Sequence, residues 1–116
     1  MTRSTSAAAQ KLASAAPVFA ALGEPARLRI VSKLCEAGPL SIVRLTQGAN
    51  ISRQAVTKHL YALSDAGLVR HERSGRESLW RLETMRLAEA QQYLDQITAR
   101  WDDALVRLKA LTEGAT

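Results

Sequence analysis

Apolar residues recur at intervals of three and four along most of the chain, which is the spacing typical of amphipathic helices. We expect a first helix over residues 7–22, ended by Gly23. The apolar residues that share its inner face are Leu12, Ala15, Phe19 and Leu22. A second helix is predicted to begin at Pro25, because proline is tolerated at the first helical position, and to stop at Gly38. The residues that we expect it to bury are Leu28, Val31, Leu34 and Cys35.

Residues 41–66 have the pattern of two helices separated by about four residues. Ser41 and Ser52 are predicted to cap the two helices, since a serine oxygen accepts a hydrogen bond from a free first-turn amide. So short a connection makes the helices cross steeply, which is the helix-turn-helix arrangement. We expect Asn50 to take the left-handed conformation in the turn, and Gly67 to end the second of these helices.

The period then changes to two, which predicts a small antiparallel hairpin, or wing, over residues 68–82. Its strands are residues 68–73 and 78–82, joined through a turn that contains Gly75. We expect His71 on the first strand to have a structural role.

After the wing, Thr84 is predicted to cap a long last helix over residues 84–112. This helix has apolar residues at strict seven-residue intervals. One row is Leu87, Leu94, Trp101 and Leu108, and the other is Ala90, Ile97, Ala104 and Leu111. So long a seam predicts packing along a partner helix. The alternative is a terminal helix that folds back on its own domain.

The fold class is therefore mainly α with a small β-hairpin: a single winged helix-turn-helix domain over residues 1–116, with residues 1–6 disordered. Residues 7–22 and 84–112 are the predicted dimerisation helices. The predicted dimer contacts are Leu12, Phe19, Leu87, Leu94, Ile97, Trp101, Leu105 and Leu108.

Composition narrows the function. The 116 residues include one Cys, so no internal disulfide framework or all-cysteine metal cage is available. No apolar run approaches the length of a membrane span, and we expect a cytoplasmic protein without a membrane partner. The net charge of +5 is uneven, because residues 25–81 carry ten basic and four acidic groups, whereas residues 82–116 carry four and six. A basic middle segment attracts nucleic acid, although lysine and arginine used for solubility would give the same pattern.

The outward face of the helix over residues 53–66 carries hydrogen-bond donors and no carboxylate. Arg53 and Lys58 suit guanine, and Gln54 suits adenine. Arg53 also opposes the helix dipole at a cost of about 0.3 to 1 kcal/mol, which a nearby phosphate would offset. Arginines flank the wing tip, where a hairpin beside a major-groove helix meets the DNA backbone. The predicted DNA-binding residues are Ser41, Ser52, Arg53, Gln54, Thr57, Lys58, His59, Tyr61, Arg73 and Arg76. Alternatively, this is a solvated helix face, and His59 is a packing residue at its flank.

Three stretches together resemble the ArsR-type winged helix repressors over about residues 18–82. Residues 19–30 resemble that family's "ALGDPTRLRIL" entry, residues 51–69 its "LSQSAVSHHL…L…AGLV" recognition helix and exit, and residues 75–82 its wing. The resemblance implies a homodimeric bacterial transcriptional regulator whose first and last helices build the dimer.

The chain departs from the family's metal sensors. Ser41 and Val43 stand where the "ELCVCDL" motif of those members has cysteines, and residues 83–116 contain no His or Cys. The acidic residues of the last helix, which offer only hard oxygen ligands, are Glu89, Asp95, Asp102 and Asp103. We therefore predict no metal or other cofactor, and a resemblance to a metal-independent branch. Cys35 is expected to be a small hydrophobe rather than a redox thiol.

The leading hypothesis is a dimeric repressor that binds a pseudo-palindromic operator in double-stranded DNA through two successive major grooves. A small-molecule effector of unknown identity is compatible with it. A second hypothesis is a winged helix module that binds an acidic protein partner. An enzyme is not expected, because the chain has two His, no Gly-rich phosphate loop and no nucleophile beside a base.

Overall fold

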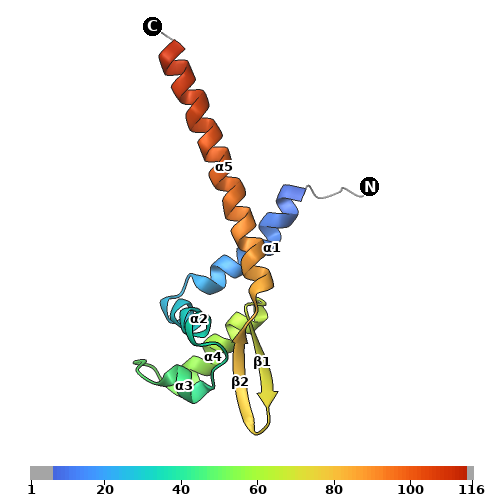
Figure 1. Cartoon of the computed structure of the whole chain (residues 1–116), viewed down its shortest axis with the longest axis vertical. Helices are drawn as coiled ribbons and strands as arrows, with labels where there is room; N and C mark the ends of the chain where they lie inside the picture. The colour runs from blue at the N-terminus through green and yellow to red at the C-terminus, as the bar shows by residue number, and fades with distance from the viewer. Residues whose placement is uncertain (1–6, 115–116) are drawn as a thin grey trace.

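The computed structural model describes residues 7–114, so the expectation of disorder for residues 1–6 lies outside the described residues. The elements follow in the order α1 (Ala7–Leu22), α2 (Pro25–Ala37), α3 (Ile42–Thr46), α4 (Arg53–Asp65), β1 (Val69–Ser74), β2 (Glu77–Leu82) and α5 (Thr84–Gly114) (Figure 1). This is the predicted winged helix-turn-helix. The last helix begins at Thr84 itself, so the prediction that Thr84 is its cap was wrong.

The core lies where α1, α2, α3, α4 and the wing meet. Its fully buried side chains are Val18, Leu34, Leu45, Val56, Leu60, Leu63 and Leu68. Three of them, Val56, Leu60 and Leu63, form the inner stripe of α4. Burial of this stripe fixes which side of α4 faces outward, since residues on opposite sides of a helix alternate with its 3.6-residue period.

The face that α2 buries differs from the prediction. Ile30, Val31 and Leu34 are buried, whereas Leu28 is 50% exposed and Cys35 is exposed. The apolar residues of α2 extend around more than half of the helix, so the sequence left two orientations open. The structure turns the helix toward Ile30, and Leu28 and Cys35 lie on the order of 100° from the centre of the buried face.

The helix-turn-helix has both of its predicted serine caps. The Ser41 Oγ accepts a hydrogen bond from the amide of Arg44 at 3.2 Å, and the Ser52 Oγ accepts one from the amide of Ala55 at 3.1 Å. The left-handed residue in the turn is Gly48, with φ of 73°, and not Asn50. Glycine has no Cβ to clash in this conformation, so Gly48 adopts it more readily than Asn50 does.

The wing is held to the body of the domain through its second strand. The register pairs Val69 with Leu82 and Ser74 with Glu77, which leaves a two-residue turn at Gly75 and Arg76. Trp80 also exchanges two backbone hydrogen bonds with Leu40, of 2.8 and 3.0 Å. This bridge to Leu40, two residues before α3, was not predicted, and it ties the wing to the helix-turn-helix.

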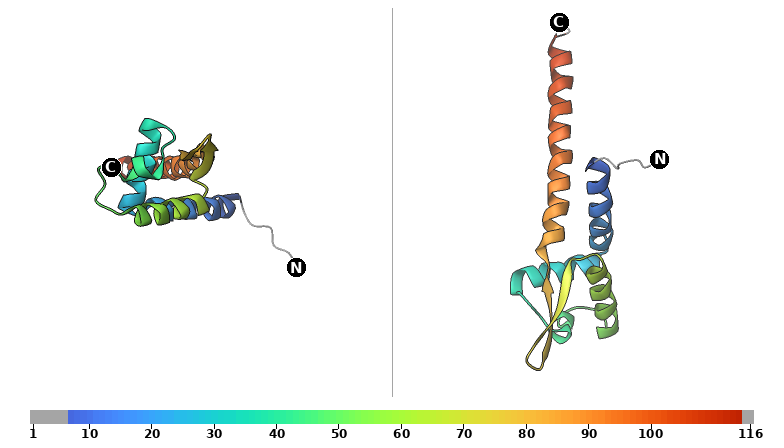
Figure 2. Two further views of the ribbon diagram at one scale, coloured as in Figure 1. Left: turned by 90° about the horizontal axis from the view of Figure 1, so that it is seen from below. Right: turned by 90° about the vertical axis from the view of Figure 1, so that its right-hand side faces the viewer.

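Helices α1 and α5 lie side by side and extend away from the wing, toward the other end of the molecule. Helix α5 continues well past α1 (Figure 2). The Phe19 and Tyr93 rings pack at a centroid distance of 6.5 Å. Helix α5 has 31 residues, or about 46 Å, within a molecule 70 Å long. Among the helices of residues 7–114, none combines the length and the apolar character that a membrane-spanning segment requires.

Candidate nucleic-acid interface

The outward face of α4 has the composition that the sequence predicted. Arg53, Gln54 and Lys58 are exposed, and together with Thr57 they line a shallow hollow in the surface. The Thr57 hydroxyl donates a hydrogen bond to the carbonyl of Arg53 at 2.8 Å, so its oxygen remains free to accept. Within residues 7–114, neither Arg53 nor Lys58 forms an ion pair. The face is therefore cationic and uncompensated.

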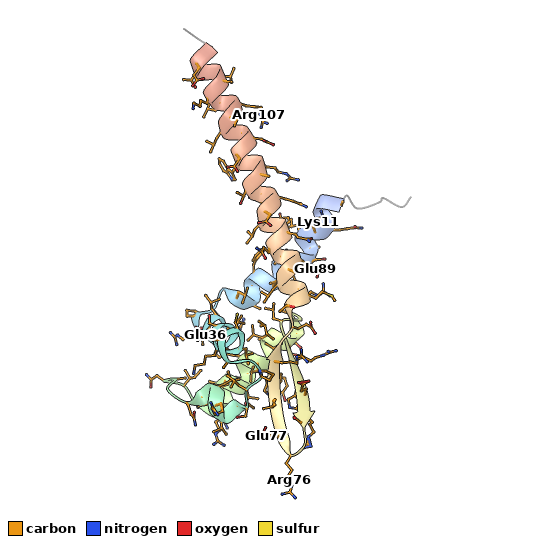
Figure 3. The ribbon with its side chains drawn as sticks, in the orientation of Figure 1. Lys11, Glu36, Arg76, Glu77, Glu89 and Arg107 are labelled. Atoms are coloured by element: carbon orange, nitrogen blue, oxygen red, sulfur yellow. The ribbon has the colours of Figure 1, made fainter. Side chains whose placement is uncertain are left out.

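The wing contains four arginines, and their partners divide them into two pairs. Arg70 lies 3.8 Å from a Glu83 oxygen, and Arg81 lies 3.6 Å from a Glu72 oxygen. Arg73 and Arg76, the two arginines predicted to bind DNA, have no carboxylate partner in the described part of the chain. Arg76 extends from the tip of the hairpin, away from the body of the domain (Figure 3). The two unpaired arginines thus lie toward the tip, which also carries the acidic Glu77.

Tyr61 connects the recognition helix to the wing instead of standing free. Its ring meets the Trp80 ring edge-on, with centroids 5.9 Å apart and planes at 85°, although the residue is 59% exposed. The His71 ring packs on the other ring of this cluster, 4.7 Å from Trp80, and its Nε2 hydrogen-bonds to the Ser78 Oγ. The structural role expected for His71 agrees with these contacts. The cluster fixes the position of the wing relative to α4.

His59 faces α2 and not the outward surface. The Arg27 Nε donates to the His59 Nδ1 at 3.4 Å, and a Glu24 carboxylate oxygen lies 3.5 Å from the same nitrogen. Glu24 also caps α2 by accepting from the Arg27 amide at 3.2 Å. The packing alternative for His59 therefore fits its position better than a phosphate contact. Glu24 and Arg27, three residues apart beside Pro25, were not singled out in the sequence as a network.

The fold lowers the pKa of the Glu24 carboxyl. Partial burial raises the pKa of its carboxyl, but hydrogen bonds from the Ala26 and Arg27 amides, followed by the charges of His59 and Arg27, outweigh this and hold the pKa below its ordinary value of 4.5. A group whose pKa is lowered by folding stabilises the folded state above its unfolded pKa, and it loses that contribution as the pH falls through the folded value.

Replacing Glu24 with Gln should therefore reduce stability at neutral pH, where the ionised carboxylate caps α2. We expect the difference between the wild type and Glu24→Gln to shrink steadily as the pH falls below 4.5. Urea unfolding at a series of pH values measures this difference. A constant difference across the series would show that the charge of Glu24 does not matter.

The two predicted serines serve first as caps. Ser41 is half-buried and Ser52 is exposed, and each uses its oxygen as an acceptor for a helix amide. A hydroxyl that accepts can still donate its own proton, so both remain able to bind a phosphate oxygen. Lys33, which the sequence did not single out, donates to the carbonyls of Leu45 and Gln47 at 3.2 and 3.0 Å, and so satisfies the end of α3.

The predicted dimer residues fall into two groups. Phe19, Leu87 and Ile97 are half-buried, and the first two pack against the core. The exposed group comprises Leu12 (51%), Leu94 (48%), Trp101 (64%), Leu105 (55%) and Leu108 (61%). Beyond Ile97, only Ala104 of the described residues of α5 is half-buried. The alternative of a helix folded back on its own domain is therefore wrong for the second half of α5.

Among the residues that the structure describes, no group of three or more His, Cys, Asp or Glu side chains is placed to hold a metal ion. That the protein is independent of metals stays a prediction.

Comparisons with known proteins agree with this architecture. A family profile described as a helix-turn-helix domain matches residues 22–72. The chain is 35% identical to the HTH-type transcriptional repressor SmtB of Mycobacterium tuberculosis, over 81% of this chain and 67% of that protein. It is 40% identical to the uncharacterized HTH-type transcriptional regulator YuzN of Bacillus subtilis, over 51% of this chain and 71% of that protein.

Two solved structures are also similar. The ArsR-like transcriptional regulator from Rhodococcus sp. RHA1 matches with a TM-score of 0.77 and 36% identity, covering 88% of this chain and 95% of that one. Mb0332 from Mycobacterium bovis, described as a homodimeric winged helix-turn-helix DNA-binding domain, matches with a TM-score of 0.63 and 25% identity, covering 86% and 91%.

Fold, exposed cations and relatives together define a helix-turn-helix transcriptional regulator of the winged type. The chain belongs to the ArsR family of these regulators, as its sequence resemblance implied. This is a class of regulators and not of enzymes.

Proposed function

We propose that the protein is a transcriptional repressor that binds double-stranded DNA as a homodimer. Outward side chains of α4 enter the major groove, and the wing tip contacts the adjacent backbone. The observation that carries the proposal is the distribution of unpaired charge. Arg53, Lys58, Arg73 and Arg76 have no ion-pair partner in the described residues, whereas Arg70 and Arg81, on the same wing, do.

Position supports the same proposal. Helix α4 and the wing lie at one end of the molecule, opposite the free end of α5 (Figure 1). The Tyr61–Trp80 contact and the Leu40–Trp80 bridge hold them in a fixed relation. In a twofold dimer joined through α5, two such surfaces would meet successive major grooves of a pseudo-palindromic operator, about 34 to 36 Å apart. Such a regulator acts in the cytoplasm, on the nucleoid.

The two alternatives predict different partners. A module that binds an acidic protein would be captured equally well after nuclease treatment and would not shift DNA. Fluorescence anisotropy with the DNA upstream of its own coding sequence separates the two hypotheses. We expect a site there whose log affinity falls linearly with log salt. Binding that ignores both sequence and salt would contradict the proposal.

Removing the charge at the wing tip should weaken binding to every sequence by a similar factor. Phosphate contacts carry no base information, so Arg76→Ala should leave the preference between operators unchanged. The salt slope should fall by about one for each lost phosphate contact, hence by about two in a dimer. Arg81→Ala is the matched control, because Arg81 lies on the same wing and pairs with Glu72. An equal loss of salt slope in both variants would place the phosphate contact elsewhere.

A further inference from the structure

A cavity of about 290 Å³ lies between α2 and the turn that joins α3 to α4. It is away from the recognition face, because none of the outward residues of α4 lines it. Its apolar walls are Ala26, Ile30, Leu45, Ala49, Ile51 and Val56. All three helices around the turn therefore contribute to the cavity.

Two cations of α2 also line this apolar space, and no acidic residue does. The Arg29 side chain is exposed, and within residues 7–114 its guanidinium has no hydrogen-bond or ion-pair partner. Lys33 uses two of its three N–H groups on the carbonyls of Leu45 and Gln47, which leaves one donor for a ligand. The cavity thus combines an apolar interior with uncompensated positive charge.

We infer that this cavity binds a small amphiphilic carboxylate, with its apolar body among the walls and its carboxylate on Arg29 and Lys33. A carboxylate accepts charge-assisted hydrogen bonds from both side chains, whereas an amine would be repelled by them. The volume of about 290 Å³ is just below the roughly 300 to 1,000 Å³ of most small-molecule sites, so the ligand is small.

A ligand in this cavity acts directly on the helix-turn-helix. The cavity is bounded by α2 and by both helices of the helix-turn-helix, and Lys33 holds the end of α3. A carboxylate bound to the third N–H of Lys33 and to Arg29 draws the ammonium away from the carbonyls of Leu45 and Gln47, which weakens these two hydrogen bonds and shifts α3 and α4 relative to α2. This effector role rests on the proposed DNA binding, but occupancy of the cavity does not.

Octanoate tests occupancy without DNA, in the full chain, by amide chemical shifts and calorimetry. We expect saturable binding with shifts confined to residues 26–33, 45–51 and 56. Octylammonium, with the same chain and the opposite charge, should bind about tenfold more weakly, because its ammonium is repelled by Arg29 and Lys33 and cannot accept their hydrogen bonds. Equal binding of the two amphiphiles, or shifts centred on α5, would overturn the site.

Arg29→Gln should weaken octanoate by about tenfold and leave the affinity for operator DNA unchanged. Lys11→Gln on α1 removes a cation outside this cavity and should change neither (Figure 3). If Arg29→Gln weakened the binding of DNA instead of the binding of octanoate, Arg29 would contact a phosphate and the proposed site would be wrong.

Saturating octanoate should change operator affinity severalfold, and an unchanged affinity would overturn the effector role. If the wild type bound no DNA, the proposed function would fail while the octanoate titration would still decide the site.

Discussion

Trp101→Glu is expected to convert the protein from a dimer to a monomer. Trp101 is 64% exposed in the protomer and lies in the seven-residue row with Leu94 and Leu108, which are also exposed. A twofold seam would bury two new carboxylates without partners, and an unpaired buried charge costs several kcal/mol. Light scattering should therefore give the mass of one 12.6 kDa chain. Operator affinity should fall by about 100-fold or more, because a monomer loses the gain from linked half-sites.

Val106→Glu is the matched control for this experiment. Val106 is 67% exposed, on the same part of α5, but lies about 140° around the helix from Trp101. The same change of an exposed apolar residue to glutamate should leave the dimer and its operator affinity intact. Helical content from circular dichroism shows whether either variant unfolds. If the Trp101→Glu protein were folded and dimeric, the dimer interface would have to lie outside this row of residues.

The elements of this fold could be predicted because their signals are local. Ser52 caps α4 and Gly67, with φ of 78°, ends it, and both positions follow from the chemistry of single residues. The heptad of α5 was equally plain, since its period extends over most of the helix. Where two residues competed for one role the sequence misled, because Gly48 and Asn50 both suit a left-handed turn and only packing decides between them.

The contacts between elements needed the structure. Nothing in the sequence relates Lys33 to the end of α3 or Arg27 to His59, which is 32 residues away. The orientation of α2 was ambiguous for a similar reason, because its apolar residues cover more than one face. The cavity beside Arg29 arises from the same placement of α2 against the turn, so no motif could have shown it.

Arg53→Ala and Gln54→Ala should relax the choice of base without abolishing binding. Both side chains are exposed on the first turn of α4, where the first residues of a recognition helix meet base edges. A bidentate contact to a base discriminates by about 1–3 kcal/mol, so each variant should lose about 5- to 150-fold of preference at one base pair per half-site. Loss at a guanine is expected for Arg53, and loss at an adenine for Gln54.

Titration of every single-base variant of the operator measures this change, with Arg76→Ala as the control. The wing-tip variant should lower all affinities together, whereas each α4 variant should flatten the profile at its own position. Arg53 is the sharper test. Its positive charge in the first turn is unfavourable beside the positive end of the helix dipole, and an anionic or electronegative partner would offset this cost. If Arg53→Ala instead lowered all affinities equally, Arg53 would be a phosphate contact, and sequence recognition would depend on Gln54, Thr57 and Lys58.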